Sequence, residues 1–310
     1  MTRVLVLGGG PDAERRVSID SAAAITDALR DDGAFDVNSI TIDRPTADEL
    51  AAMPGDVVFP ALHGPFGEGG ELQNLLGQSG RPYVGSGPTS ARLAMDKLAT
   101  KLVAARLGVA SPDACVFDPR NDACPIDLPR VIKPVHDGSS FGVHLVRDNQ
   151  QWEGAFETAS ADATANPGRV YMVERLIIGR ELTVGLLETS GKLDALPVTE
   201  IVPGDGFYDY ESKYKRDDTR YLIDPDLPAG VAENISCDAL KLADALGVRH
   251  LARVDFMLDT GGTPWLLEIN TMPGFTGHSL LPMAARTRGL DMPALCAQLV
   301  RCALPEHAIA

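Results

Sequence analysis

The chain has 310 residues, of which 45% are apolar, and a formal net charge of -15. This length and composition predict a globular protein with room for two or three domains, and they exclude an intrinsically disordered chain. The acidic balance argues against non-specific binding to nucleic acid or to an anionic membrane, although lysines and glycine loops can still hold a phosphate locally.

The five cysteines are scattered, odd in number and without metal-ligand spacing, which is typical of a protein in a reducing compartment. The residues after Met1 show no basic and apolar leader, and no apolar run reaches membrane-spanning length. We therefore expect a cytoplasmic protein with neither a membrane nor nucleic acid among its partners.

Residues 1–90 alternate between strand and helix patterns. Strands are expected at 3–7, 37–42 and 56–59, and a helix is expected at about 18–31. This alternation predicts a parallel α/β unit, in which ligands bind in loops at the carboxyl ends of the strands.

The glycines after the first strand allow two interpretations. Gly8, Gly10 and Ala13 match the dinucleotide fingerprint of a dehydrogenase. That interpretation is disfavoured because Asp12 and Glu14 would put negative charge where the pyrophosphate should lie, and because the helical pattern begins later. In the preferred interpretation Glu14 faces an amine of a ligand, and the ordinary alternative is an acid in the first turn of a helix.

A single helix is expected over residues 90–107, in which Lys97 taken alone is most often a solvated lysine. The segment 129–146 is more specific: a strand delivers Lys133, a small-residue loop follows at 138–142, and a second strand returns. Backbone N–H groups and hydroxyls of such a loop can wrap a polyphosphate, and the lysine adds a point charge. A plain hairpin with a polar tip would explain the glycines but not the lysine.

Further strands are expected at 169–177, with Glu174 near the end, and at 182–187, directly after Glu181. The segment 204–220 is aromatic and charged with little periodicity, which is typical of an Ω-type loop that closes over a site. A mobile surface loop is the alternative. A helix at about residues 227–246 follows this segment.

Residues 253–270 predict a β-hairpin, because two apolar runs flank a turn that contains Gly261 and Gly262. Symmetric pairing about that turn puts Asp255 opposite Glu268, although a slip of one residue would break this register. The opposite faces are expected to anchor the hairpin in a core through Val254, Phe256, Leu258, Leu267 and Ile269.

The same pairing puts Arg253 opposite Asn270. Carboxylates that face each other across a ladder repel, so the pair of acids implies a positive charge between them. Carboxylate and amide oxygens suit Mg²⁺ that also binds a substrate phosphate. An ordinary solvent-facing hairpin is the alternative. The loop after the hairpin leads to a helix, where N–H groups near Ser279 and Leu280 can bind a carboxylate.

Several segments together resemble the D-alanine–D-alanine ligases of the ATP-grasp superfamily, in that family's order and over nearly the whole chain. They are Ala13-Glu-Arg-Arg-Val-Ser, Ala61-Leu-His-Gly, Met95-Asp-Lys-Leu, Lys133-Pro with Gly138-Ser-Ser-Phe-Gly, Phe207-Tyr-Asp-Tyr-Glu-Ser-Lys-Tyr, Arg253-Val-Asp, Leu267-Glu-Ile-Asn-Thr and His278-Ser-Leu.

The resemblance implies an α/β, three-domain ATP-grasp architecture. It implies a parallel, Rossmann-like N-terminal domain at 1–90, a central domain at 91–178 and a C-terminal domain at 179–310 with the lid loop 204–220. The nucleotide is expected between the two antiparallel-sheet domains.

The resemblance also implies a reaction, in which ATP drives the joining of two D-alanine molecules through an acyl phosphate for peptidoglycan synthesis. It implies a homodimer as well. A D-alanine–D-lactate or related ligase is the alternative on the same scaffold, and the pair Lys213 and Tyr214 favours the dipeptide product. A nucleotide-regulated binding protein without turnover is a second alternative. The residues that argue against it are the intact Arg253, Asp255, Glu268 and Asn270.

The resemblance assigns roles to individual residues. The implied catalytic residues are Glu14, Ser139, Tyr214 and Arg253, and Ser139 is expected to link Glu14 to Tyr214. The residues implied to bind D-alanine are His63, Gly274, Ser279 and Leu280. The residues implied to bind ATP are Lys97, Lys133, Ser140, Glu174, Ile177, Glu181 and Lys213. The implied ligands of two Mg²⁺ ions, for which Mn²⁺ can substitute, are Asp255, Glu268 and Asn270.

Two positions depart from the expected pattern. The pair Arg15 and Arg16 replaces an acid beside Glu14, and Gly277 stands where a hydroxyl residue is common. Both departures loosen the details of the substrate site.

Overall fold

The computed structural model describes residues 1–120, 124–204 and 218–305. The strands are β1 (Thr2–Gly9), β2 (Phe35–Ile42), β3 (Val57–Pro60), β4 (Ala114–Phe117), β5 (Arg130–Pro134), β6 (His144–Val146), β7 (Tyr171–Arg175), β8 (Gly179–Thr189), β9 (Lys192–Ala195), β10 (Thr199–Val202), β11 (Arg220–Ile223), β12 (Leu251–Asp259) and β13 (Pro264–Asn270). The helices are α1 (Arg15–Asp32), α2 (Ala47–Ala52), α3 (Gly64–Glu68), α4 (Glu71–Gln78), α5 (Pro88–Met95), α6 (Lys97–Leu107), α7 (Asn149–Ala165), α9 (Val231–Leu246), α10 (Leu280–Arg286) and α11 (Met292–Ala303).

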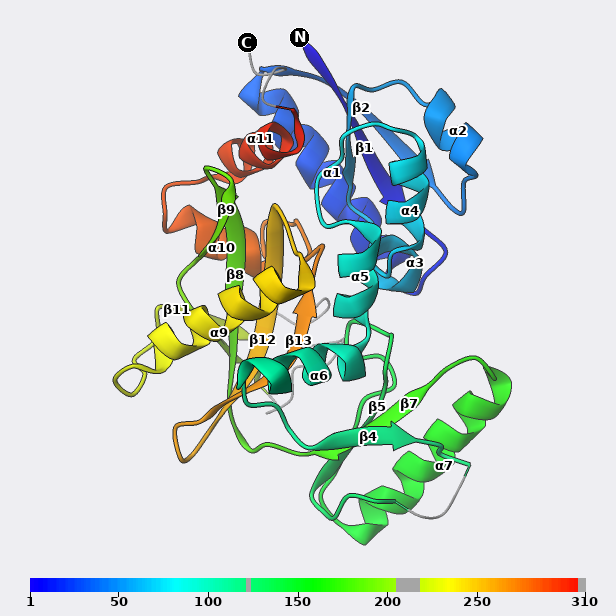
Figure 1. Ribbon diagram of the computed structural model, residues 1–310, viewed down its shortest axis with the longest axis vertical. Helices are drawn as coiled ribbons and strands as arrows, with labels where there is room; N and C mark the ends of the chain where they lie inside the picture. Colours follow the sequence, from blue (N-terminus) through cyan, green and yellow to red (C-terminus); the bar gives the residue numbers. More distant parts are fainter. Residues whose placement is uncertain (121–123, 205–217, 306–310) are drawn as a thin grey trace.

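The described strands form three sheets, which Figure 1 shows from top to bottom. The first is a parallel sheet of order β2-β1-β3. The second, in the middle, is antiparallel, with order β11-β10-β8-β12-β13 and with β9 paired to β8. The third is antiparallel, with order β4-β7-β5-β6. The expected combination of one parallel and two antiparallel sheets is therefore confirmed.

Alternation along β1 gives the parallel sheet two apolar faces. Val4 and Val6 pack with α1 and α11, whereas Leu5 and Leu7 pack with α2 and α4 on the other face. The helix α1 approaches β1 closely at Gly8, where an added Cβ would lie 2.6 Å from the Cβ of Ala22. This sheet therefore depends on α11, from the other end of the described chain, to cover one of its faces.

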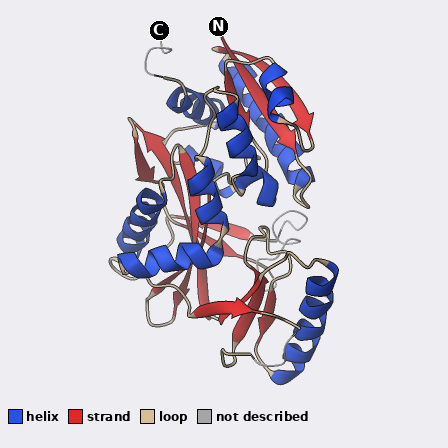
Figure 2. Ribbon diagram, turned by 45° about the vertical axis from the view of Figure 1, so that its right-hand side comes forward, coloured by secondary structure: helices blue, strands red, loops and turns tan. Residues whose placement is uncertain are grey.

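The two antiparallel sheets are each covered by helices. The helix α9 crosses the six-stranded sheet (Figure 1) and buries Ile235, Ala239 and Leu242 against it. The helix α7 lies along the outer face of the four-stranded sheet (Figure 2), where Ala155, Ala159 and Ala163 repeat every four residues and are buried. The inner faces of these two sheets are left to line a pocket.

The helices expected at about 18–31 and 227–246 are confirmed with shifted starts, the second beginning at Val231, whereas the single helix expected at 90–107 was wrong. The first helix begins at Arg15 instead of about Ser18, because polar residues in its first turn weaken the apolar pattern there. The single helix expected at 90–107 is two helices, α5 and α6, which break at Asp96 with an extended ψ of 100°. The Asp96 side chain caps α6 by accepting hydrogen bonds from the backbone N–H groups of Leu98 and Ala99 at 3.0 and 2.9 Å.

The predicted hairpin register is confirmed at its functional end. Asp255 pairs with Glu268, and Arg253 pairs with Asn270. Toward the turn the register shifts by one residue, so that Phe256 pairs with Leu266. This β-bulge corrects the expected core, because Leu266 is buried in place of Leu267, which lines the pocket beside Glu268.

A search of the described helices for a stretch apolar and long enough to span a bilayer finds none.

The cap of α6 gives a stability prediction. Replacing Asp96 with Ala leaves two N–H groups at the helix terminus without their acceptor and should lower the free energy of unfolding by about 1 kcal/mol, as measured in urea titrations. Asp96→Asn is the matched control, since an asparagine side chain also caps helices. An Asn variant as unstable as the Ala variant would contradict the capping role.

Candidate active site

Two adjoining pockets lie between the sheets. The larger pocket has a volume of about 400 Å³ and is lined from both antiparallel sheets by residues that include Lys97, Lys133, Ser140, Glu174, Ile177, Glu181, Asp255, Leu267 and Glu268. The smaller pocket has a volume of about 90 Å³ and is lined by Glu14, His63, Glu68, Gly138, Ser139, Arg253, Glu268, Asn270, Met272, Pro273, Gly274, Thr276, His278, Ser279 and Leu280. Glu268 lines both pockets, so its side chain marks their junction.

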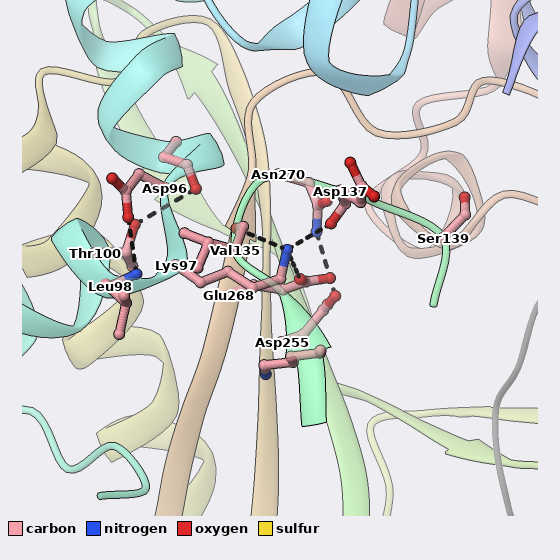
Figure 3. Close-up of polar contacts among 12 residues, drawn as sticks. Asp96, Lys97, Leu98, Thr100, Val135, Asp137, Ser139, Asp255, Glu268 and Asn270 are labelled. Atoms are coloured by element: carbon pink, nitrogen blue, oxygen red, sulfur yellow. Dashed lines mark hydrogen bonds and ion pairs between the residues drawn. The ribbon is translucent and has the colours of Figure 1, made fainter. Parts of the chain in front are cut away.

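The hairpin β12–β13 builds this junction. The Arg253 guanidinium donates to both oxygens of Asp255, from Nε at 2.9 Å and from a terminal nitrogen at 2.7 Å. The Thr183 hydroxyl donates to the same carboxylate at 2.5 Å, and the Asn270 amide donates to it at 3.3 Å. Figure 3 shows Asp255, Glu268 and Asn270 converging from neighbouring strands. The predicted metal ligands are therefore brought together.

These oxygen atoms fit a hard divalent cation. Two carboxylates face each other across the ladder at Asp255 and Glu268, and Asn270 adds an amide. Within the residues that the structure describes, no three His, Cys, Asp or Glu side chains gather into a metal-binding group, so the fit rests on two acids and an amide. That donor chemistry is the one that Mg²⁺ uses when it keeps waters and substrate phosphates as its other ligands.

Lys97, at the first position of α6, is buried rather than solvated. Its ammonium lies 3.4 Å from the Glu268 carboxylate and donates to the carbonyl oxygen of Asp137 at 2.6 Å (Figure 3). The Asp137 side chain is in turn held by Arg169 at 3.1 Å. The helix terminus and the loop after β5 are thus tied together at the pocket wall.

The loop 138–142 joins the two pockets from the other side. Ser139 and Ser140 both have left-handed backbones, with φ of 50° and 58°, a conformation that is costly for residues other than glycine and often occurs at functional sites. The Ser139 hydroxyl donates a hydrogen bond to a carboxylate oxygen of Glu14, which is buried at the N-cap position of α1. One half of the expected Glu14–Ser139–Tyr214 connection is therefore present, and Tyr214 lies outside the described residues.

Glu174 forms a buried cluster with two lysines at the wall of the larger pocket. Its carboxylate lies 2.5 Å from the ammonium of Lys133 and 2.9 Å from that of Lys101. Burial alone would raise the pKa of Glu174, but the two lysines together lower it. Sequence analysis missed Lys101, although its position four residues after Lys97 put both lysines on one face of α6.

His63 connects the N-terminal sheet to the loop after β13. Its Nδ1 lies 3.0 Å from the carbonyl oxygen of Met272, which only accepts, so Nδ1 carries the proton. Its Nε2 therefore accepts from the Ser21 hydroxyl at 3.2 Å, and the oxygen of that hydroxyl accepts from the N–H of Phe275 at 3.2 Å. Burial, together with the charge of Arg253, lowers the pKa of His63 to about 4, so the ring is neutral at pH 7. Ser21 was not predicted and is recognisable only through this long-range contact.

Glu68, the last residue of α3, was also missed. Its carboxylate accepts from the backbone N–H groups of Gly64 at 3.3 Å and Met272 at 3.4 Å. Burial raises the pKa of Glu68, and the nearby Glu14 carboxylate raises it further. This side chain helps to hold together the two loops that frame the smaller pocket.

The remaining predicted residues divide into three groups. Ser140, Ile177 and Glu181 line the larger pocket, and Gly274, Ser279 and Leu280 line the smaller one. Lys213, Tyr214 and most of the predicted lid loop lie outside the described residues. The Ser279 hydroxyl accepts from the N–H of Thr276 at 2.9 Å, which shapes the turn before α10.

The structure accounts for the two departures from the family pattern. Arg15 does not line either pocket, because its guanidinium caps the carboxyl ends of β1 and β2 at the carbonyl oxygens of Gly10 (2.6 Å) and Ile42 (3.2 Å). Arg16 pairs with Asp20 one turn further along the helix. Gly277 is exposed, and an added Cβ there would meet no atom within 4 Å.

Comparisons with known proteins agree with this arrangement. Residues 120–301 match the family described as D-ala D-ala ligase C-terminus, and residues 45–86 match D-ala D-ala ligase N-terminus. The D-alanine–D-alanine ligase of Bordetella petrii is 42% identical over 303 residues, which cover 96% of this chain and 91% of that protein.

Solved structures give the same result. The D-alanine–D-alanine ligase from Coxiella burnetii has a TM-score of 0.81 and 27% identity, covering 97% of this chain and 93% of that one. The VanG D-Ala:D-Ser ligase from Enterococcus faecalis has a TM-score of 0.82 and 26% identity, covering 98% and 99%.

A pocket held between two antiparallel sheets, beside a parallel α/β unit, defines the ATP-grasp class of enzymes. Within that class, the chain belongs to the D-alanine–D-alanine ligase family.

The neutral state of His63 gives a pH prediction. The pKa of His63 is about 4 in the folded protein and about 6.5 in the unfolded chain, so at pH values between these two the unfolded chain binds more protons. The stability that the neutral His63 contributes is therefore complete above pH 6.5 and is lost as the pH falls toward 4. The free energy of unfolding should therefore fall less steeply on acidification in His63→Gln than in the wild type, by up to about 1.4 kcal/mol per pH unit. Urea titrations at several pH values measure this slope.

Ser21→Ala is the control for this effect, because it removes a hydrogen bond and keeps the buried histidine. It should lower stability while retaining the wild-type slope with pH. A His63→Gln variant with an unchanged slope would contradict the assignment.

Proposed function

We propose that this chain joins two D-alanine molecules to D-alanyl-D-alanine at the expense of ATP, as a step in peptidoglycan precursor synthesis. The observation that carries the proposal is the junction of the two pockets at Glu268. The larger pocket has a volume typical of sites for ligands of nucleotide size, and the smaller one has room for a ligand of few heavy atoms. A group transferred from one ligand to the other has to pass this junction.

In the proposed first step, a carboxylate oxygen of the first D-alanine attacks the γ-phosphorus of ATP. The bond between that phosphorus and the bridging oxygen breaks, giving an acyl phosphate and ADP. Glu14, buried and accepting from Ser139, receives the ammonium of this D-alanine. Arg253, already fixed by its bidentate contact with Asp255, supplies preorganised positive charge to the transferring phosphoryl group.

In the second step, the amine nitrogen of the second D-alanine attacks the acyl carbon. The carbon–oxygen bond to the phosphate breaks, and inorganic phosphate leaves with the proton that the amine gives up. Ser279 and the N–H of Leu280 bind the carboxylate of this second D-alanine, with Gly274 beside them. The N–H of Ser279 itself donates to the carbonyl oxygen of Thr276 at 3.0 Å. His63 lines the smaller pocket near the ammonium of the first D-alanine. Tyr214 completes the connection to Ser139, and the lid loop keeps water from the acyl phosphate.

The nucleotide occupies the larger pocket in this proposal. Lys97 and Lys133 hold the phosphates with Ser140 and Lys213, Glu181 binds the ribose, and Ile177 contacts the adenine. Glu174 lines the same pocket and contacts the adenine, as the resemblance implies, and its carboxylate also orients Lys133.

Asp255, Glu268 and Asn270 would hold two Mg²⁺ ions, or Mn²⁺ in their place. When bound, these ions neutralise phosphate charge and polarise the phosphoryl oxygens. We also propose a cytoplasmic homodimer, with domains at 1–90, 91–178 and 179–310.

The activity is tested by measuring ADP release under four substrate conditions. D-alanine alone should give ADP, inorganic phosphate and dipeptide in equal amounts, whereas L-alanine should give none. D-alanine with D-lactate or with D-serine tests for a mixed product. Absence of ADP release under all four conditions would overturn the proposed ligase activity. A dominant mixed product would instead show that the second substrate is D-lactate or D-serine and not D-alanine.

Glu268→Gln tests the junction of the two pockets. It removes a charge that faces Asp255 and contacts Lys97, and it should lower the rate of ADP release by about a hundredfold or more. Glu233→Gln, on the exposed face of α9, is the matched control and should keep the wild-type rate. A Glu268→Gln enzyme with a near-normal rate would show that the metal ligands are wrongly assigned.

A further inference from the structure

Lys101 is a buried lysine with no place in the mechanism described so far. It lies on α6 one turn after Lys97, and it does not line either pocket. Its ammonium lies 2.9 Å from one carboxylate oxygen of Glu174 and donates to the carbonyl oxygen of Pro112 at 3.1 Å. The other oxygen of Glu174 contacts Lys133, which does line the larger pocket. Glu174 thus separates an inner lysine from the pocket lysine.

The charges in this row do not cancel. Lys133 and Glu174 alone would form a neutral pair, and the addition of Lys101 gives the row a net charge of one positive unit. The other two cations near the junction are each matched by an acid, since Lys97 contacts Glu268 and Arg253 is bidentate to Asp255. The row of Lys101, Glu174 and Lys133 therefore adds net positive charge at the wall of the larger pocket, which Arg147 and Arg175 also line. Asp113 acts on Lys101 as well, but less strongly than Glu174 does.

Burial makes this unmatched charge effective. The side chains of Lys101, Glu174 and Lys133 are 7%, 3% and 8% exposed, so water screens them weakly. Removing the charge of a second lysine from water costs free energy unless an opposite charge or a bound anion compensates it. A neutral residue in place of Lys101 would leave Lys133 paired with Glu174, and its ammonium would offer a polyphosphate little net attraction.

We propose that Lys101 is a positioning residue for nucleotide binding, which offsets the charge of Glu174 so that Lys133 presents net positive charge to a polyphosphate. The inference rests on the proposed function in taking a nucleotide as the ligand of the larger pocket. The Glu174 carboxylate orients Lys133, and Lys101 prevents that carboxylate from cancelling the charge of Lys133.

The test measures binding instead of turnover. Isothermal titration calorimetry with ADP and with adenosine separates attraction for the phosphates from contacts with the nucleoside. Lys101→Met should weaken ADP binding about tenfold, the size expected for one weakly screened unit charge acting across the pocket wall, and should leave adenosine binding unchanged. Lys241→Met, an exposed lysine on α9, changes the net charge equally and should leave ADP binding unchanged.

The double variant Lys101→Met/Glu174→Gln decides between an electrostatic and a purely structural role. It removes one positive and one negative charge, so the row keeps a net charge of one unit through Lys133. The ratio of ADP to adenosine affinity should therefore return to the wild-type value. A structural role predicts instead that the double variant binds ADP no better than Lys101→Met, and this outcome would overturn the proposal.

Other outcomes also have a defined meaning. If the Lys101→Met protein is folded, as its urea midpoint shows, and binds ADP as tightly as the wild type, the inference about Lys101 is overturned. The proposed function would stand in that case, provided that the wild type releases ADP. If Lys101→Met does not fold, the double variant is compared directly with the wild type. A ratio of ADP affinity to adenosine affinity that is tenfold lower in the double variant than in the wild type would contradict the electrostatic role of Lys101. Failure of the wild type to bind ADP would remove the proposed function itself.

Discussion

The constraint on which the site depends is the pairing of two acids across one pair of strands. Asp255 and Glu268 face each other because of the register in which β12 and β13 pair at this end of the hairpin, and they are tolerated because each has a cation beside it. Arg253 comes from the same strand as Asp255, and Lys97 comes from the start of α6. A pair of carboxylates that would destabilise an isolated hairpin thereby fixes the position of two cations at the pocket junction.

The smaller pocket is built from contacts between distant segments. His63 reaches Met272, Ser21 reaches Phe275, and Ser139 reaches Glu14. Each of these hydrogen bonds joins two different parts of the chain, so the pocket forms only when the parallel sheet, the loop after β5 and the loop after β13 are all in place. The neutral His63 and the high pKa of Glu68 follow from this enclosure, since both groups lose water when the segments meet.

The sequence predicted what depends on local pattern and on motifs. The hairpin register followed from two apolar runs around one turn, and the loop at Ser139 and Ser140 followed from its small residues. The bulge at Leu267 and the break at Asp96 escaped prediction, because the bulge carries no glycine or proline and the break lies within a continuous helical pattern. Lys101, Ser21 and Glu68 were missed for another reason: each acts on a partner far along the chain, and only the packed structure reveals which buried polar groups meet.

The packing of α11 against α1 also bears on how the chain folds during synthesis. Leu299 and Val300 of α11 share one apolar cluster with Ile25 and Leu29 of α1, so the parallel sheet has one face completed by residues that leave the ribosome long after its strands. Until then that face is open to water or to another apolar surface. The sheet whose strands are made before α11 therefore gains its full apolar cover only after α11 has been made.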